Sequence, residues 1–257
     1  MISIITRPPY NVFFRDQLRN ARNRAIDDVE NFDELLYAFE RLGCFLSKKI
    51  GDLGQYKKPI VELAEKSCLA IEVPSSWHEW HLEAARLFEI VQEARNDALH
   101  QGAFARHLTT RAIELSIVLE DALMTDAEKV VHYMVRDPVC AYLWQPISFI
   151  RQQMLAHSFS YLPVPVYVEE KPAWKLVSDL LIAKYLRSVS KNERKKRLAK
   201  SLQEAIKDGL EPLDAQCFYS DDDIDKVISK LNALPILICH SENQKDLIGI
   251  LTPFDLL

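Results

Sequence analysis

The chain has 257 residues, of which 48% are hydrophobic and 27% are charged, and its formal net charge is −5. This composition is typical of a soluble globular protein with one or two domains. The negative net charge excludes binding of nucleic acid through bulk attraction, so any such contact requires a local basic patch.

No stretch of the sequence approaches 18 consecutive apolar residues, which predicts that no helix crosses a membrane. Residues 1–9 lack the basic leading end and the small-residue cleavage site of a signal peptide. The five cysteines are odd in number, widely spaced and without a CxxC pair, which argues against a disulfide framework and a zinc site. We therefore expect a cytoplasmic protein with reduced, buried thiols and no bound metal.

The first predicted helix carries Arg15, Arg19 and Arg22 at helical spacing, so that three guanidinium groups share one stripe. Such a stripe is either a solvated face or a surface for RNA. Asn31 then caps a second predicted helix, because its side chain can accept a hydrogen bond from the first turn.

A third helix is predicted around residues 60–69, after a break at Gly51 and Gly54. Ser75 or Ser76 then caps a long helix that runs to about residue 101. Its partner helix follows Gly102, and two antiparallel helices joined by a short break indicate a bundle.

Trp77, Trp80 and Phe88 recur at helical spacing along the long helix. Aromatic stripes of this kind usually pack inside a protein, so the pattern predicts core residues instead of a platform for stacking bases. Residues 125–128 read as a capping box, in which Thr125 and Glu128 would satisfy each other's backbone donors. We therefore expect a helical domain over residues 1–124 and a second domain over residues 125–257.

The second domain is predicted to alternate strands and helices. Short strands are expected at residues 139–141 and 214–218, and stronger ones at 161–168, 234–239 and 247–251. The order β-α-β-β-α occurs twice, in a first unit at about 128–188 and a second at about 211–257. Residues 189–210 form a charged helical linker whose basic core, at residues 194–197, is either a solvated helix or a contact for nucleic acid. The predicted fold class is an all-α bundle followed by this α/β module.

The stretch Glu93-Ala-Arg-Asn-Asp-Ala-Leu-His-Gln-Gly102 gathers groups suited to RNA cleavage. RNA carries its own nucleophile, the 2′-hydroxyl, so cleavage without metal requires a proton-transfer group and a cation for the charged phosphorane. His100 and Arg95 are of these types, and Asn96 can orient the imidazole or hold a phosphate oxygen. Arg95 and His100 lie about 140° apart on a straight helix. Either the helix breaks near residues 99–102, or two copies pool their residues across a two-fold dimer.

This stretch resembles the signature of HEPN domains, an Arg followed by a polar residue and, a few positions later, a His. HEPN domains are all-helical bundles that dimerise, and many are metal-independent ribonucleases of toxin, antiviral and stress systems, whereas other members only bind. The resemblance covers roughly residues 10–124, although only the short motif is specific. It implies that Arg95 and His100 are catalytic and that Asn96 assists them.

The stretch Leu247-Ile-Gly-Ile-Leu-Thr-Pro-Phe-Asp255 suits binding of a nucleotide. Gly249 lets a ligand or another backbone come close to a strand. Thr252 begins a helix where its hydroxyl and free amides can meet a phosphate. Asp255 can accept both hydroxyls of a ribose.

This stretch resembles the CBS-domain signature, and the tandem duplication over residues 128–257 resembles a CBS pair. The resemblance implies one site for adenosine-type ligands such as ATP, ADP or AMP, built on Thr252, Asp255 and Gly249, with Pro235 and Ile236 from the preceding strand. In the first unit Lys175 stands in the place of the Gly and Leu181 in that of the Asp, and only Ser178 is kept. A pair of this kind could also serve only as a dimerisation scaffold.

Together these expectations describe a homodimeric, metal-independent endoribonuclease that cleaves RNA with its helical domain and is regulated by an adenine nucleotide. The alternative is a non-catalytic, nucleotide-sensing module whose helical half binds RNA or a protein. A signalling scaffold in which neither site works is the third option.

Overall fold

The computed structural model describes residues 2–28, 31–101, 106–187, 190–240 and 243–257. Side chains are described throughout these ranges except at residues 2–3, 96–101, 106–107 and 243–245. The chain divides into two compact units, Met1–Ala127 and Glu128–Leu257. We call them the helical unit and the mixed unit, and each is described by itself.

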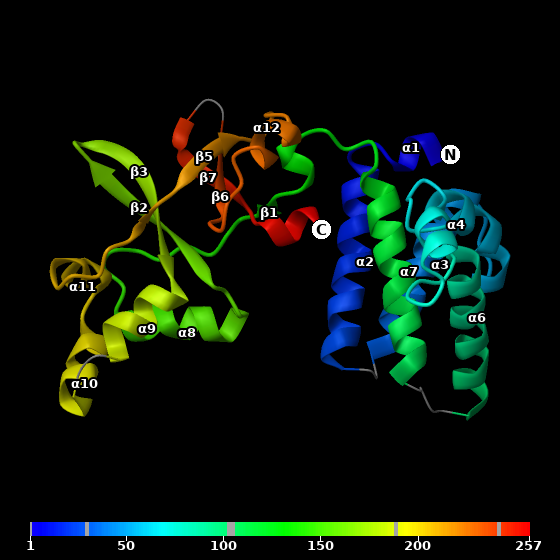
Figure 1. Ribbon diagram of the computed structural model, residues 1–257, viewed down its shortest axis with the longest axis horizontal. Coiled ribbons are helices and arrows are strands. Elements are labelled where there is room, and N and C mark those ends of the chain that lie inside the picture. The colour runs from blue at the N-terminus through cyan, green and yellow to red at the C-terminus, as the bar shows by residue number, and fades with distance from the viewer. Residues whose placement is uncertain (1, 29–30, 102–105, 188–189, 241–242) are drawn as a thin grey trace. The chain divides into compact units, whose positions relative to one another are not determined.

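The helical unit is built from helices of very different length. α2 lies beside both α7 and α3, and α6 lies beside α7 and α4 (Figure 1). Phe32, Phe39 and Phe88 are among the fully buried side chains of its single core. The elements are α1 (Ile2–Ile5), α2 (Tyr10–Asp27), α3 (Phe32–Ser47), η2 (Leu53–Tyr56), α4 (Lys57–Ala64), α5 (Glu72–Ser76), α6 (Ala84–Gln101) and α7 (Arg106–Met124).

Some of the predicted helix ends are wrong. Asn31 does precede α3, but its side-chain amide donates to the carbonyl of Arg24 and makes no capping bond. Ser75 and Ser76 form the end of α5, and the long helix α6 begins only at Ala84. Thr125 makes no capping box, because its hydroxyl donates to the carbonyl of Ala122 and so closes the end of α7.

Trp77 and Trp80 were expected in the core, and this prediction is wrong, since they are 64% and 76% exposed. Phe88, predicted with them, is fully buried. The reason is that α6 begins at Ala84, so both tryptophans lie in the segment that precedes the helix and not on its apolar face.

The arginine stripe of α2 is neither a solvated face nor a surface for RNA. It faces α7, where Glu120 is buried. Arg22 donates from Nε and Nη2 to the two carboxylate oxygens of Glu120, at 2.8 and 3.0 Å, and Arg19 Nε lies 3.5 Å from the same carboxylate. Arg15 is only 4% exposed and donates to Asp16. Because buried charges need partners, this cluster holds α2 against α7 in one register.

The mixed unit contains two sheets whose strands are mostly antiparallel. One has the order β1-β7-β6-β5, in which only β5 and β6 are parallel, and the other has the order β2-β3-β4. The elements are η3 (Val130–His132), β1 (Val135–Arg136), α8 (Ile147–His157), β2 (Tyr161–Val168), β3 (Lys171–Ser178), α9 (Asp179–Arg187), α10 (Lys191–Ala199), α11 (Leu202–Lys207), β4 (Leu213–Asp214), β5 (Gln216–Tyr219), α12 (Ile224–Ile228), β6 (Ile236–His240), β7 (Asn243–Leu251) and η4 (Pro253–Leu256).

The two halves of the mixed unit exchange strands. β1 belongs to the first half, at about residues 128–188, but pairs with β7 of the second (Figure 1), whereas β4 belongs to the second half, at about residues 211–257, and pairs with β3 of the first. Each half keeps its own hydrophobic core. Residues 139–141 form no strand. The Ala141 N–H nevertheless donates to the carbonyl of Pro163 in β2, at 2.8 Å, so this segment lies beside β2. The predicted strand at 214–218 is divided between β4 and β5.

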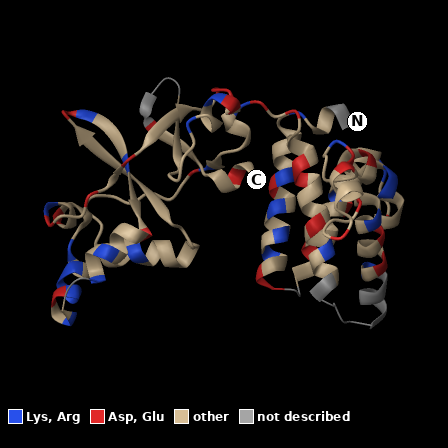
Figure 2. Cartoon of the chain, viewed as in Figure 1, with Lys and Arg blue, Asp and Glu red and all other residues tan. Residues whose placement is uncertain are grey.

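The predicted charged linker forms α10 and α11. α10 has no buried residues, and Figure 2 colours the Lys and Arg positions along it blue. The expectation that the thiols are buried is wrong for Cys68 and Cys217, which are exposed. Within the described ranges no helix is long and apolar enough to cross a membrane.

Candidate functional site

The Arg95 motif lies near the end of α6. α6 continues without a break to Gln101, so Arg95 and His100 belong to one helix. The Nη2 atom of Arg95 lies 3.1 Å from the Oε1 atom of Glu40 on α3, and both side chains are 27% exposed. The side chains of Asn96 and His100 lie outside the described residues.

The sequence offered a helix break near residues 99–102 as one way to bring Arg95 and His100 to the same phosphate. α6 has no break up to Gln101. His100 lies five positions after Arg95 in the helix, which corresponds to about 7.5 Å along the axis and about 140° around it. No break before Gln101 brings the two positions onto one face.

Glu40 is a residue that the sequence did not single out. It faces Arg95 from another helix, and nothing in the local sequence of either helix indicates the pairing. The ion pair gives the guanidinium a fixed position and also partly neutralises it. A phosphate that approaches Arg95 therefore competes with the Glu40 carboxylate.

The second predicted site lies where β6 and β7 meet η4. Ile236, the first residue of β6, pairs with Leu251, the last residue of β7. This register brings the buried Pro235 and Ile236 beside the strand end from which Thr252 follows.

Thr252 and Asp255 form a hydrogen-bonded pair at this strand end. The backbone N–H and the hydroxyl of Thr252 both donate to Asp255 Oδ2, at 2.7 and 2.8 Å. The pair is the capping box of η4, and Asp255 is 8% exposed. Because a buried carboxylate is costly unless it is hydrogen-bonded, these bonds fix where the acceptor oxygens lie.

The side chain of Met134 packs against Gly249. Gly249 pairs with Ile238 of β6 and Arg136 of β1. A Cβ atom at this position would lie 2.5 Å from the sulfur of Met134. The glycine thus makes room for Met134, a contact that the sequence analysis missed.

The corresponding position in the first half is built differently. Lys175 Nζ lies 2.8 Å from Asp214 Oδ1, in an ion pair between β3 and β4. Ser178 Oγ accepts the backbone N–H of Leu181 at 3.2 Å and caps α9. The hydroxyl cap is present in both halves, but the first half has an apolar side chain where the second half has the carboxylate of Asp255.

Neither the family models nor the curated proteins searched match this sequence. Solved structures align with about half of the chain. A CBS domain-containing protein of unknown function from Bacillus anthracis is 13% identical, with a TM-score of 0.40, over 50% of this chain and 88% of that one. CbpB in complex with c-di-AMP is 15% identical (TM-score 0.36, 50% and 81% covered), and CBSX2 in complex with AMP is 13% identical (TM-score 0.35, 50% and 92% covered).

Proposed function

We propose that this protein binds an adenine nucleotide through Thr252 and Asp255 and uses the bound ligand as a regulatory signal. The observation that carries the proposal is the buried Asp255 carboxylate, held by two hydrogen bonds from Thr252 at the end of β7. A carboxylate fixed in this way can accept the two hydroxyls of a ribose. Pro235 and Ile236, both buried, pack beside this strand end.

Calorimetric titration with AMP, ADP, ATP and c-di-AMP tests this site. Asp255→Asn keeps the side-chain size but removes the charge, and we expect it to weaken binding at least about tenfold, because hydrogen bonds to charged groups contribute about 1.5–3 kcal/mol. Asp179→Asn, at the start of α9 in the first half, is the matched control and should bind like the wild type. Equal dissociation constants for Asp255→Asn and the wild type would contradict the proposal.

Cleavage of RNA by the helical unit is the second candidate function. It is favoured by Arg95, which Glu40 holds in place while more than a quarter of the side chain stays accessible. In this mechanism the 2′-hydroxyl loses its proton and attacks the adjacent phosphorus, and the bond from phosphorus to the 5′-oxygen breaks, which leaves a 2′,3′-cyclic phosphate and a protonated 5′-hydroxyl. His100 transfers the proton, and Arg95 stabilises the charged phosphorane. Asn96 orients the imidazole or holds a phosphate oxygen. The reaction requires no metal.

Labelled RNA incubated in EDTA, with and without the same nucleotides, tests for cleavage. We expect His100→Ala and Arg95→Ala each to lower the rate at least about 100-fold, the usual contribution of a proton-transfer group. Arg86→Ala, on the same helix and paired with Glu89, is the control that should retain the rate. Wild-type cleavage by His100→Ala would exclude this role, and RNA binding without cleavage under any ligand would favour a binding module.

A mixing experiment tests whether two copies form the site. If each site takes Arg95 from one copy and His100 from the other, mixing Arg95→Ala with His100→Ala protein restores one complete site in each mixed dimer. Random reassociation then returns about one quarter of the wild-type rate. A mixture as inactive as its components would show that one chain supplies both residues or that the site is not catalytic.

A nucleotide can regulate the helical unit only if it binds the active and inactive arrangements with different affinity. The rates measured with each nucleotide in the cleavage experiment test this coupling directly. Asp255→Asn should abolish any nucleotide dependence while leaving the basal rate unchanged.

A further inference from the structure

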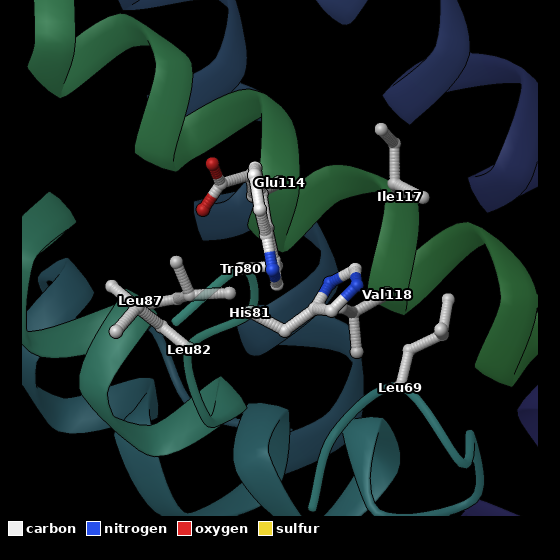
Figure 3. A pocket seen from close by; sticks show the side chains of 8 residues that line it. All are labelled: Leu69, Trp80, His81, Leu82, Leu87, Glu114, Ile117 and Val118. Atoms are coloured by element: carbon white, nitrogen blue, oxygen red, sulfur yellow. The ribbon is translucent and has the colours of Figure 1, made fainter. Parts of the chain in front are cut away.

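Trp80 borders a cavity of about 230 Å³ in the helical unit. The lining is mostly aliphatic and comes from α6, α7 and the segments beside them, and it includes Leu87, Ile117 and Val118 (Figure 3). Two polar side chains also line it, His81 and Glu114. The volume is below the about 300 Å³ at which pockets for drug-sized ligands begin, so the cavity suits one small planar group.

The indole of Trp80 lines an apolar cavity and is also 76% exposed. Large aromatic rings normally bury their surface, and an exposed one at a pocket marks a binding surface. An exposed ring face can stack on a nucleobase, and such stacking contributes about 1–3 kcal/mol per base.

Glu114 is held in a fixed orientation by its neighbour on α7. Arg111 Nη1 donates to both carboxylate oxygens of Glu114, at 2.8 and 2.7 Å. Arg111 already neutralises the carboxylate of Glu114. A ligand cation bound to the same carboxylate would therefore be repelled by the positive charge of Arg111. A neutral group with N–H donors is a better complement to this carboxylate than an ammonium or a guanidinium group.

We propose that this pocket takes one nucleobase with an exocyclic amino group, stacked on Trp80 with its N–H edge toward Glu114. The base belongs either to single-stranded RNA or to a free nucleotide. The RNA source rests on the second candidate function described above, whereas the free-nucleotide source does not. The pocket is separate from Thr252 and Asp255, which belong to the mixed unit.

The test uses 2′-O-methyl hexamers, which bind without being cleaved because the 2′-hydroxyl nucleophile is blocked. Fluorescence anisotropy gives the affinities for oligo(A), whose base has an amino group, and oligo(U), whose base has none. We expect Trp80→Ala to weaken oligo(A) binding by about 5- to 150-fold, Trp80→Phe to keep most of it, and Glu114→Gln to reduce the preference for oligo(A). Trp144→Ala is the matched control, since Trp144 is 73% exposed in the mixed unit.

A second arm titrates AMP into Asp255→Asn protein, in which the other nucleotide site is impaired, and follows tryptophan fluorescence. Quenching that Trp80→Phe removes would identify a free nucleotide as the source. Oligo(A) affinity that is equal in Trp80→Ala and Trp144→Ala protein, with no quenching by AMP, would overturn the proposal. These binding measurements are independent of the rate of RNA cleavage, so failure of the ribonuclease assignment leaves them interpretable.

Discussion

The ends of β3 and β7 have the same hydroxyl cap but different neighbouring contacts. Each strand ends in a hydroxyl residue, Ser178 or Thr252, that caps the next helix. Three residues before the hydroxyl, the first half has Lys175, which reaches to Asp214, and the second half has Gly249, which leaves room for Met134. The two strand ends therefore share the hydroxyl cap and differ in what the position three residues before it contacts.

Replacing Gly249 of the second half with lysine, the residue of the first half, should have the largest effect on stability. We expect Gly249→Lys to lower the free energy of unfolding by about 3 kcal/mol, because the side chain collides with Met134 and buries an amine. Urea denaturation followed by circular dichroism measures the change. Gly249→Ala should cost less stability in a Met134→Ala background than in the wild type, and equal costs in the two backgrounds would show that the Met134 contact is not the cause.

Removing the two caps should have a smaller and unequal effect. Thr252→Val keeps the shape but leaves the buried Asp255 carboxylate without the hydroxyl, and we expect a loss of about 2 kcal/mol. Ser178→Ala removes a hydroxyl that accepts a hydrogen bond from the backbone and should cost about 1 kcal/mol. Thermal unfolding of both variants checks this order. A larger loss of stability in Ser178→Ala than in Thr252→Val would show that the first half depends more on its cap than the second.

Breaking the Lys175–Asp214 ion pair should have the smallest effect. Asp214 is 93% exposed, and exposed ion pairs contribute about 0–1 kcal/mol. We therefore expect Lys175→Ala to change the free energy of unfolding by less than about 0.5 kcal/mol and to leave the affinity for AMP unchanged. A clear loss of AMP affinity in calorimetry would place a ligand in the first half instead.

The sequence predicted the existence of most elements because helical and strand periods are local signals. It failed where a partner from a distant segment decides the outcome. The spacing of Arg15, Arg19 and Arg22 is the same whether the stripe faces water or α7, and only Glu120, about 100 residues later, makes burial possible. One signal was present in retrospect, since Glu120 and Asp121 interrupt the apolar residues of α7.

In the candidate sites, too, local contacts could be predicted and contacts between distant segments could not. The Thr252–Asp255 pair was predictable as a pair because its residues are three apart and meet through a local cap. Glu40 beside Arg95 and Met134 beneath Gly249 were not, since each contact joins elements that are distant in sequence. The exposure of Trp80 was missed because the start of α6 was placed too early.

The exchange of β1 and β4 also has a consequence in time. Val135 pairs with Ile250, which the ribosome adds 115 residues later. At about 5–20 residues per second, the segment of β1 waits about 6 to 23 s for its partner, whereas β2 and β3 can form their hairpin as soon as both are made. During that interval the apolar residues that will become the second core have no sheet to cover them. In a nascent chain the pairing of β1 with β7 therefore depends on synthesis reaching Leu251.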